Sequence, residues 1–272
     1  MRPVVALAAF LFLLVCQPCA GSAQTAEEQT RLAWAEQRGQ MLFEIDRAAW
    51  VTTDDLAARI ADLRSSGIRG WTVERDGQGY VVVYYTGEGA ARVALYRGRV
   101  ENNAVVSGEV FPEGSRPPLT PAQRRIADAR DLVPRLGRQP CTPASFNVAV
   151  IPPEAPGAAI DVYALTPQVE NDVFPFGGHF RATVSPSGEI VAQRAFTNSC
   201  LNMSRRGHDQ SITAALGVTH LLDPIPTEIH VFLSIWAQLP VFVGTRSPFR
   251  LWEVDGRHIR LVPTPPDSPP PT

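Results

Sequence analysis

The chain has 272 residues, of which 44% are hydrophobic, and its formal net charge at pH 7 is −2. This length suits one large domain or two small ones, and the hydrophobic fraction is enough for a sizeable core. All 25 basic residues are arginine and no basic block stands out, which argues against nucleic acid as a partner and against a polybasic membrane contact. Because the chain has no lysine, Schiff-base chemistry and cofactors held as a lysine imine are excluded.

The first 23 residues have the layout of a secretory signal peptide. Arg2 precedes an apolar run from Val4 to Val15, and small residues follow up to Ala23, after which we expect cleavage. The run is shorter than the ~20 residues of a spanning helix, so we expect no stable membrane insertion after cleavage. Arginine in place of lysine, with abundant Ala and Pro, is typical of a GC-rich bacterial genome. The sequence therefore predicts a bacterial protein that is periplasmic or secreted.

Residues 24–115 predict a lobe of N-terminal helices packed on an antiparallel meander. Apolar residues recur at helical spacing over 26–50, with Gly39 as a candidate break, and a second helix begins at a cap on Thr52 or Thr53. β-rich runs separated by Gly, Asp and Asn then indicate strands. These runs cover 71–75, 80–85, 92–100 and 105–111.

Residues 116–140 predict a bridging helix with its linker. Thr120 is a good N-cap, Pro121 suits the first helical position, and Gln123 completes a capping box. We expect this helix to end at Pro134.

Residues 141–262 predict a β-dominated second lobe, so that the whole chain belongs to the α+β class. Strands are expected over 146–151, 160–165, 228–236 and 241–243. A last hairpin turns on Asp255-Gly256 and sets Glu253 opposite His258. The Pro-rich segment 263–272 is expected to be a disordered tail.

The hairpin around Gly188 is the most readable part of this lobe. A loop over 186–188, with Gly188 left-handed, pairs Val184 with Ile190 and Ala182 with Ala192. This register predicts a core face and a polar face for the hairpin. The core face holds Phe180, Ala182, Val184, Ile190 and Ala192, and the polar face holds His179, Arg181, Thr183 and Gln193.

Two cysteines, Cys141 and Cys200, remain after signal cleavage. An even pair in an exported protein predicts a disulfide bond between them. A catalytic thiol at Cys200 is the alternative.

The stretch PTEIHVFLS contains the main candidates for chemistry, Glu228 and His230. On a strand, residues two positions apart share a face. A catalytic zinc takes three protein ligands and one open position, and His179, His208 or His220 could be the third ligand. The pair then either forms the solvated face of a strand or belongs to a metal-dependent hydrolase in which Glu228 carries the proton of a metal-bound water.

His179 and Arg181 are a second candidate site. Both lie on the expected polar face of the hairpin, where a histidine and an arginine could hold a carboxylate or phosphate. A solvated sheet face is the plainer alternative. No G-x-S-x-G elbow, Walker loop or complete dinucleotide fingerprint occurs in the sequence.

The stretch GQMLFEIDRAAWVTTDDL, the downstream GGHFR…G…V…R.F…C pattern and TEIHVFLS resemble exported hypothetical proteins of proteobacteria, which have no assigned activity. The resemblance implies export and a bacterial envelope location, and it transfers no catalytic residue. Together these features predict an exported, non-enzymatic binding or envelope-associated module without a cofactor, with another envelope protein as candidate partner. The alternative is a zinc-dependent hydrolase that uses Glu228, His230 and a third histidine.

Overall fold

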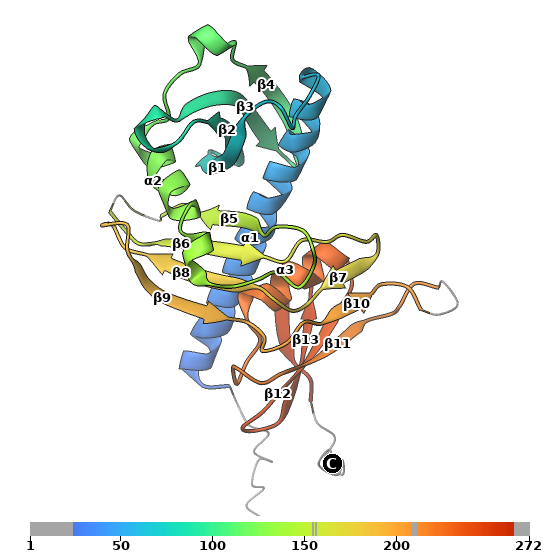
Figure 1. The fold of residues 1–272 in the computed structure, drawn as a ribbon. Coiled ribbons are helices and arrows are strands. Elements are labelled where there is room, and N and C mark those ends of the chain that lie inside the picture. Colours follow the sequence, from blue (N-terminus) through green and yellow to red (C-terminus); the bar gives the residue numbers. More distant parts are fainter. Residues whose placement is uncertain (1–23, 154, 156, 208–210, 264–272) are drawn as a thin grey trace, which may run out of the picture.

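The computed structural model describes residues 24–153, 155, 157–207 and 211–263. It has an α+β fold in which three α-helices pack against antiparallel and mixed β-sheets, as expected (Figure 1). The expected signal peptide and nearly all of the expected Pro-rich tail lie outside the described residues. Within the described ranges, no helix combines the length and the apolar character that crossing a membrane requires.

Helix α1 (Ala26–Arg59) is one continuous helix where two were expected. It runs along the length of the molecule and contacts both the N-terminal strands and helix α3 (Glu228–Ala237) (Figure 1). Gly39 does not break this helix. Its missing side chain instead allows α3 to pack closely, since a Cβ there would lie 2.5 Å from the Glu228 carbonyl oxygen. Thr52 caps nothing, since its hydroxyl donates to the Ala48 carbonyl within the helix at 2.7 Å.

The predicted meander is confirmed. It consists of β1 (Ile68–Asp76), β2 (Gly79–Thr86), β3 (Val93–Glu101) and β4 (Ala104–Val110), paired in sequence order. Strand β2 is buried along its whole length because both of its faces are covered. Val82 and Tyr84 join the core that includes α1, whereas Val81 and Val83 pack with Ala127 of helix α2 (Pro121–Arg130).

Helix α2 bridges the meander and the second sheet, as expected. The Thr120 hydroxyl accepts from the Gln123 backbone N–H at 3.2 Å, and the Gln123 side chain accepts from the Thr120 N–H at 3.0 Å, which confirms the capping box. The helix ends at Arg130, earlier than predicted, and a 3₁₀ turn (Val133–Leu136) follows. Two further 3₁₀ turns are Gly89–Ala91 and Glu113–Ser115.

The second sheet has the order β5 (Asn147–Ile151), β6 (Ile160–Leu165), β8 (Phe180–Val184) and β9 (Ile190–Ala195). One face packs on Ile126 and Ala129 of α2, and the other carries Tyr163 into the core around α1 and α3. Two short strands, β7 (Val173–Pro175) and β10 (Asn202–Ser204), form a separate pair.

The β8–β9 hairpin keeps the predicted pairing of Val184 with Ile190, and Gly188 has a φ of +84°. The predicted pairing of Ala182 with Ala192 is wrong. A bulge between Thr183 and Val184 shifts the register by one residue, so that Ala192 faces Thr183 and is exposed.

The predicted strand over 228–236 is wrong, since these residues form α3. Helix α3 joins β11 (Leu216–His220) to β12 (Val241–Thr245), and the two strands are parallel. Parallel neighbours need such a crossover connection, whereas a direct turn suffices only for antiparallel strands. Helix α3 has apolar residues on nearly all of its sides. This suits a helix that is buried between α1 and the C-terminal strands β12 and β13 (Arg250–Asp255).

The last hairpin joins β13 to β14 (His258–Leu261), and its loop lies one residue later than predicted. Asp255 pairs with His258, and Glu253 pairs with Arg260, so the predicted pairing of Glu253 with His258 is wrong. Gly256, with a φ of +56°, takes the first loop position.

The predicted disulfide between Cys141 and Cys200 is present. It ties the segment that precedes β5 to the segment that precedes β10. Gly178 fits beside it, since a Cβ there would meet the Cys141 sulfur at 2.5 Å. The bond excludes a free catalytic thiol at Cys200 in this structure.

Candidate functional site

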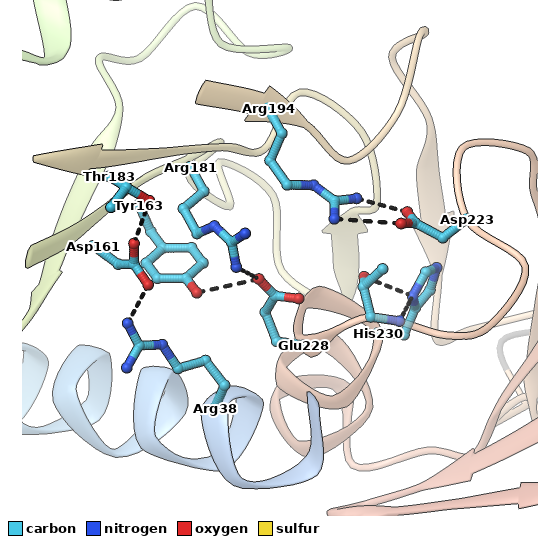
Figure 2. Close-up of polar contacts among 10 residues, drawn as sticks. Arg38, Asp161, Tyr163, Arg181, Thr183, Arg194, Asp223, Glu228 and His230 are labelled. Atoms are coloured by element: carbon cyan, nitrogen blue, oxygen red, sulfur yellow. Dashed lines mark hydrogen bonds and ion pairs between the residues drawn. The ribbon is translucent and has the colours of Figure 1, made fainter. Parts of the chain in front are cut away.

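Glu228 and His230 occupy the first turn of α3, where they are almost completely buried at 1% and 5% exposure. On a helix, successive residues are rotated by about 100°, so residues two apart point to nearly opposite sides. The prediction that the pair lies on the solvated face of a strand is therefore wrong. Their side chains also do not point in the same direction (Figure 2).

Glu228 points toward the second sheet (Figure 2). Its carboxylate accepts from the Arg181 guanidinium at 2.6 Å and from the Tyr163 hydroxyl at 3.2 Å. Beside this group, Asp161 accepts from Thr183 at 2.7 Å and pairs with Arg38 of α1. These contacts fasten two helices to one sheet face.

His230 belongs to a different set of contacts. Its Nδ1 accepts the Thr227 backbone N–H at 3.0 Å, which stabilises the start of α3. Its ring meets that of His220 edge to face at 4.7 Å between centroids. Burial, together with the neighbouring His220, lowers the pKa of His230 to about 3, so that its ring is neutral.

Asp223 anchors this second set. It accepts from Nε2 of His220 at 2.8 Å. It also accepts from Arg194 at 2.6 Å (Figure 2). Burial by itself would raise the pKa of Asp223, but the hydrogen bonds from His220 and Arg194 hold it well below its usual range.

His179 does not share a polar face with Arg181. It is fully buried, with Nδ1 accepting the Thr166 N–H at 3.2 Å and Nε2 donating to the Pro175 carbonyl at 2.7 Å. Burial lowers its pKa to about 4. Because both ring nitrogens are bonded to backbone groups, this histidine holds loops together and presents no nitrogen to a ligand. Gln193, the other member of the expected face, is exposed on β9.

The candidate metal ligands do not converge. In the part of the chain that the structure describes, no three His, Cys, Asp or Glu side chains form a group that could hold a metal ion. His208, one of the three candidate third ligands, lies outside the described residues. Glu228, His179 and His230 each form hydrogen bonds to other parts of the protein that hold its elements together.

A cleft that the sequence analysis did not predict is a better candidate. It encloses about 1080 Å³ between the second half of α1, the segment from β6 to β7, and the end of α3. Six aromatic residues line it: Phe43, Trp50, Trp71, Phe174, Phe232 and Trp236. Trp50 is exposed and Phe43 and Trp236 are half-buried, whereas the other three are buried. Pockets lined by aromatic groups between packed parts of a protein are the usual ligand sites.

Two tryptophans in this wall are held in place by neighbours. Trp50 is 58% exposed, and the Arg47 guanidinium lies over its ring, 4.2 Å from the centroid. Trp236 packs edge to face on Phe174 at 5.4 Å and against Phe232 at 5.4 Å. Trp50 therefore offers an aromatic surface to solvent at the cleft.

A smaller cavity of about 420 Å³ adjoins the cleft and shares Phe43, Asn103 and Ile235 with it. Both cavities are lined by residues of α1, and we refer to them together as the groove along α1. We call them the large and small chambers.

Asp46 lies in the wall of the large chamber and accepts a hydrogen bond from the Asn147 amide. Burial raises the pKa of Asp46 to about 6, although the Asn147 hydrogen bond opposes the shift. No local pattern could have indicated this site, because its residues come from α1, β1, the β3–β4 turn, β5, the β6–β7 segment, the end of β10 and α3.

Comparisons of the chain with protein-family models, with curated proteins and with solved structures found no match. The resemblance to exported proteins of proteobacteria therefore stays a prediction, and the function has to be argued from the groove.

Proposed function

We propose that the protein is an exported, periplasmic or secreted, binding module whose ligand occupies the groove along α1. The observation that carries the proposal is the large chamber of about 1080 Å³, with aromatic residues among its lining and with its exposed Trp50. Typical ligand pockets enclose about 300–1,000 Å³, so the chamber is large enough for a ligand of several rings.

The charges around the groove favour binding over catalysis. Asp172 is paired with Arg205 at 2.5 Å and with Arg206 at 2.6 Å, and Glu44 accepts from the Tyr80 hydroxyl at 2.6 Å. General acid–base chemistry needs a titratable group within reach of the reacting atoms. Asp46 is engaged by Asn147, and with Asp172 and Glu44 also paired we assign the groove to binding.

A fragment screen observed on the protein by NMR tests the site. The tryptophan indole N–H signals are the readout, and Trp34 is the matched control, since it lies on α1 with 42% exposure but lines neither chamber. We expect fragments to shift the Trp50 and Trp236 signals and not the Trp34 signal. Binding that shifts Trp34 and spares Trp50 would overturn the proposal.

Export has a separate test. Its support is the signal-peptide pattern of the first 23 residues, together with a disulfide bond that suits an oxidising compartment. When the full chain is expressed in a Gram-negative host, we expect periplasmic protein whose intact mass corresponds to cleavage after Ala23. Uncleaved protein retained in the cytoplasm would contradict export.

A further inference from the structure

The lining of the groove is rich in side-chain carboxamides. In the small chamber these are Gln40, Gln78, Asn102 and Asn103, and in the large chamber Asn103, Asn147, Gln168, Asn171 and Gln238. Most of the asparagines in the chain are among them. Two of the carboxamides also donate to acidic side chains, Gln40 to Glu44 at 2.8 Å and Asn147 to Asp46. A carboxamide both donates and accepts hydrogen bonds without carrying charge, as does a hydroxyl group. The groove is therefore suited to a ligand with many hydroxyl groups.

The charged groups of the groove do not form an ion-binding site. The Arg205 guanidinium is bound to Asp172, and Arg47 is stacked on Trp50 at 4.2 Å. Glu170 and Arg257 are exposed and line different chambers. Acidic and basic groups are thus both present and mostly engaged, so a strongly charged ligand would meet no concentrated field of opposite sign.

The aromatic wall supplies flat apolar faces beside these carboxamides. Arg47 covers one face of the Trp50 ring, which leaves its other face to the groove or to solvent. Aromatic faces carry negative charge density, so they attract the polarised C–H groups on the flat side of a sugar ring. A ligand of linked rings, each with hydroxyls at its edge and C–H groups on its face, matches both kinds of surface.

We infer that the groove binds an uncharged oligosaccharide whose successive sugar rings extend through both chambers. This inference rests on the proposed binding groove and names the chemistry of its ligand. Trp50 provides the stacking surface, the carboxamides provide the hydroxyl contacts, and Asn103, which lines both chambers, lies at their junction.

Isothermal titration of the folded mature protein tests the inference. The probes are neutral oligosaccharides of about six sugars from glucan, mannan and N-acetylglucosamine series, with sulfated or uronic-acid oligosaccharides of equal length and an uncharged hexapeptide for comparison. We expect at least one neutral series to bind, with affinity that rises with chain length and changes less than about twofold between low and high salt.

Two pairs of variants locate the binding. Trp50→Ala should weaken it at least about tenfold, whereas Trp34→Ala, the matched exposed tryptophan on α1, should leave it within about twofold. Gln168→Ala should weaken it severalfold, and Gln193→Ala, which removes an exposed carboxamide from β9, should not. Equal effects within either pair would overturn the inference.

The failures of the two proposals are distinguishable. Binding of the acidic oligosaccharides or of the hexapeptide without the neutral series overturns the sugar inference and leaves the binding groove intact. The same holds if NMR fragments occupy the groove and no oligosaccharide binds. If neither fragments nor any probe shifts the Trp50 signal, the proposed groove itself is wrong, and the inference falls with it.

Discussion

Arg181 of β8 and Glu228 of α3 form an ion pair at 2.6 Å, in which the Glu228 side chain is 2% exposed and the Arg181 side chain 21%. The Tyr163 hydroxyl donates to the same carboxylate oxygen at 3.2 Å. This contact fixes the first turn of α3 against the second sheet, and α3 in turn forms one wall of the large chamber.

Neutralising Glu228 is expected to be strongly destabilising. The variant Glu228→Gln leaves the Arg181 charge half-buried without its partner, and breaking a buried pair costs about 3–5 kcal/mol of unfolding free energy. Urea unfolding followed by circular dichroism measures the loss. Glu88→Gln is the control, since Glu88 pairs with Arg69 at 3.3 Å on the surface and should cost less than about 1 kcal/mol. Equal losses of unfolding free energy in the two variants would show that the buried pair contributes no more to stability than the surface pair.

Replacing Gly39 is expected to separate α1 from α3. The Cβ of Gly39→Ala would lie 2.5 Å from both the Glu228 carbonyl oxygen and the Val231 Cβ, and neither atom can rotate away. Overpacking of this kind costs about 1–3 kcal/mol, which outweighs the ~1 kcal/mol that alanine gains over glycine in a helix. Thermal unfolding measures the balance, with the exposed Gln37→Ala on the same helix as control. A higher melting temperature for Gly39→Ala would contradict the close contact.

Acid is expected to destabilise the protein through its buried histidines. His179 has a pKa of about 4 in the folded protein against 6.5 ordinarily, because burial disfavours its charged form. Between those values the unfolded chain binds a proton that the folded chain does not, so stability is present above pH 6.5 and is lost as the pH falls toward 4. His230, with a pKa of about 3, adds in the same direction.

The size of this effect follows from linkage. Between pH 7.5 and pH 5 each of the two histidines should lower the unfolding free energy by about 2 kcal/mol. Urea unfolding at the two pH values measures the sum, and His179→Gln should remove its share of the difference. His258→Gln serves as control because His258 is exposed on β14. If His179→Gln keeps the full pH dependence, the buried neutral ring is not its source.

The disulfide is expected to contribute substantially to stability. Cys141 and Cys200 are 59 positions apart, and closing a loop of that length is worth about 4 kcal/mol in the chain-entropy model. A reductant should therefore lower the urea midpoint of the natural protein toward that of the Cys141→Ala/Cys200→Ala double variant. The double variant itself should not respond to the reductant. Free thiols at both positions in protein from the periplasm would contradict the bond.

Much of the fold was predictable because its signals are local. Thr120, Pro121 and Gln123 specify a helix start within four residues, and the meander alternates short β-rich runs with turn residues. The pairing of Val184 with Ile190 follows from the turn at Gly188, although the bulge after Thr183 was not readable. Such features depend on neighbours in sequence, so the sequence suffices for them.

The candidate site was less predictable because burial decides it. Arg181 and Glu228, and likewise His230 and His220, come together only when α3 is placed between α1 and the sheets. His179 looked like a candidate ligand, yet its ring nitrogens are bonded to backbone groups of Thr166 and Pro175, 13 and 4 positions away. The groove has no local signature at all.

By itself the sequence determined the α+β class, the capped bridging helix, the order of the meander and the cysteine pair, because each depends on residue types at short spacing or on a simple count. Only the tertiary structure decided that residues 228–237 form a helix, that α1 continues through Gly39, and that carboxamides and aromatic rings from seven segments line one groove. An apolar run of ten residues suits a buried helix or a buried strand equally. Which one forms depends on the surfaces that cover it, and here these are α1, the second sheet and the C-terminal strands β12 and β13.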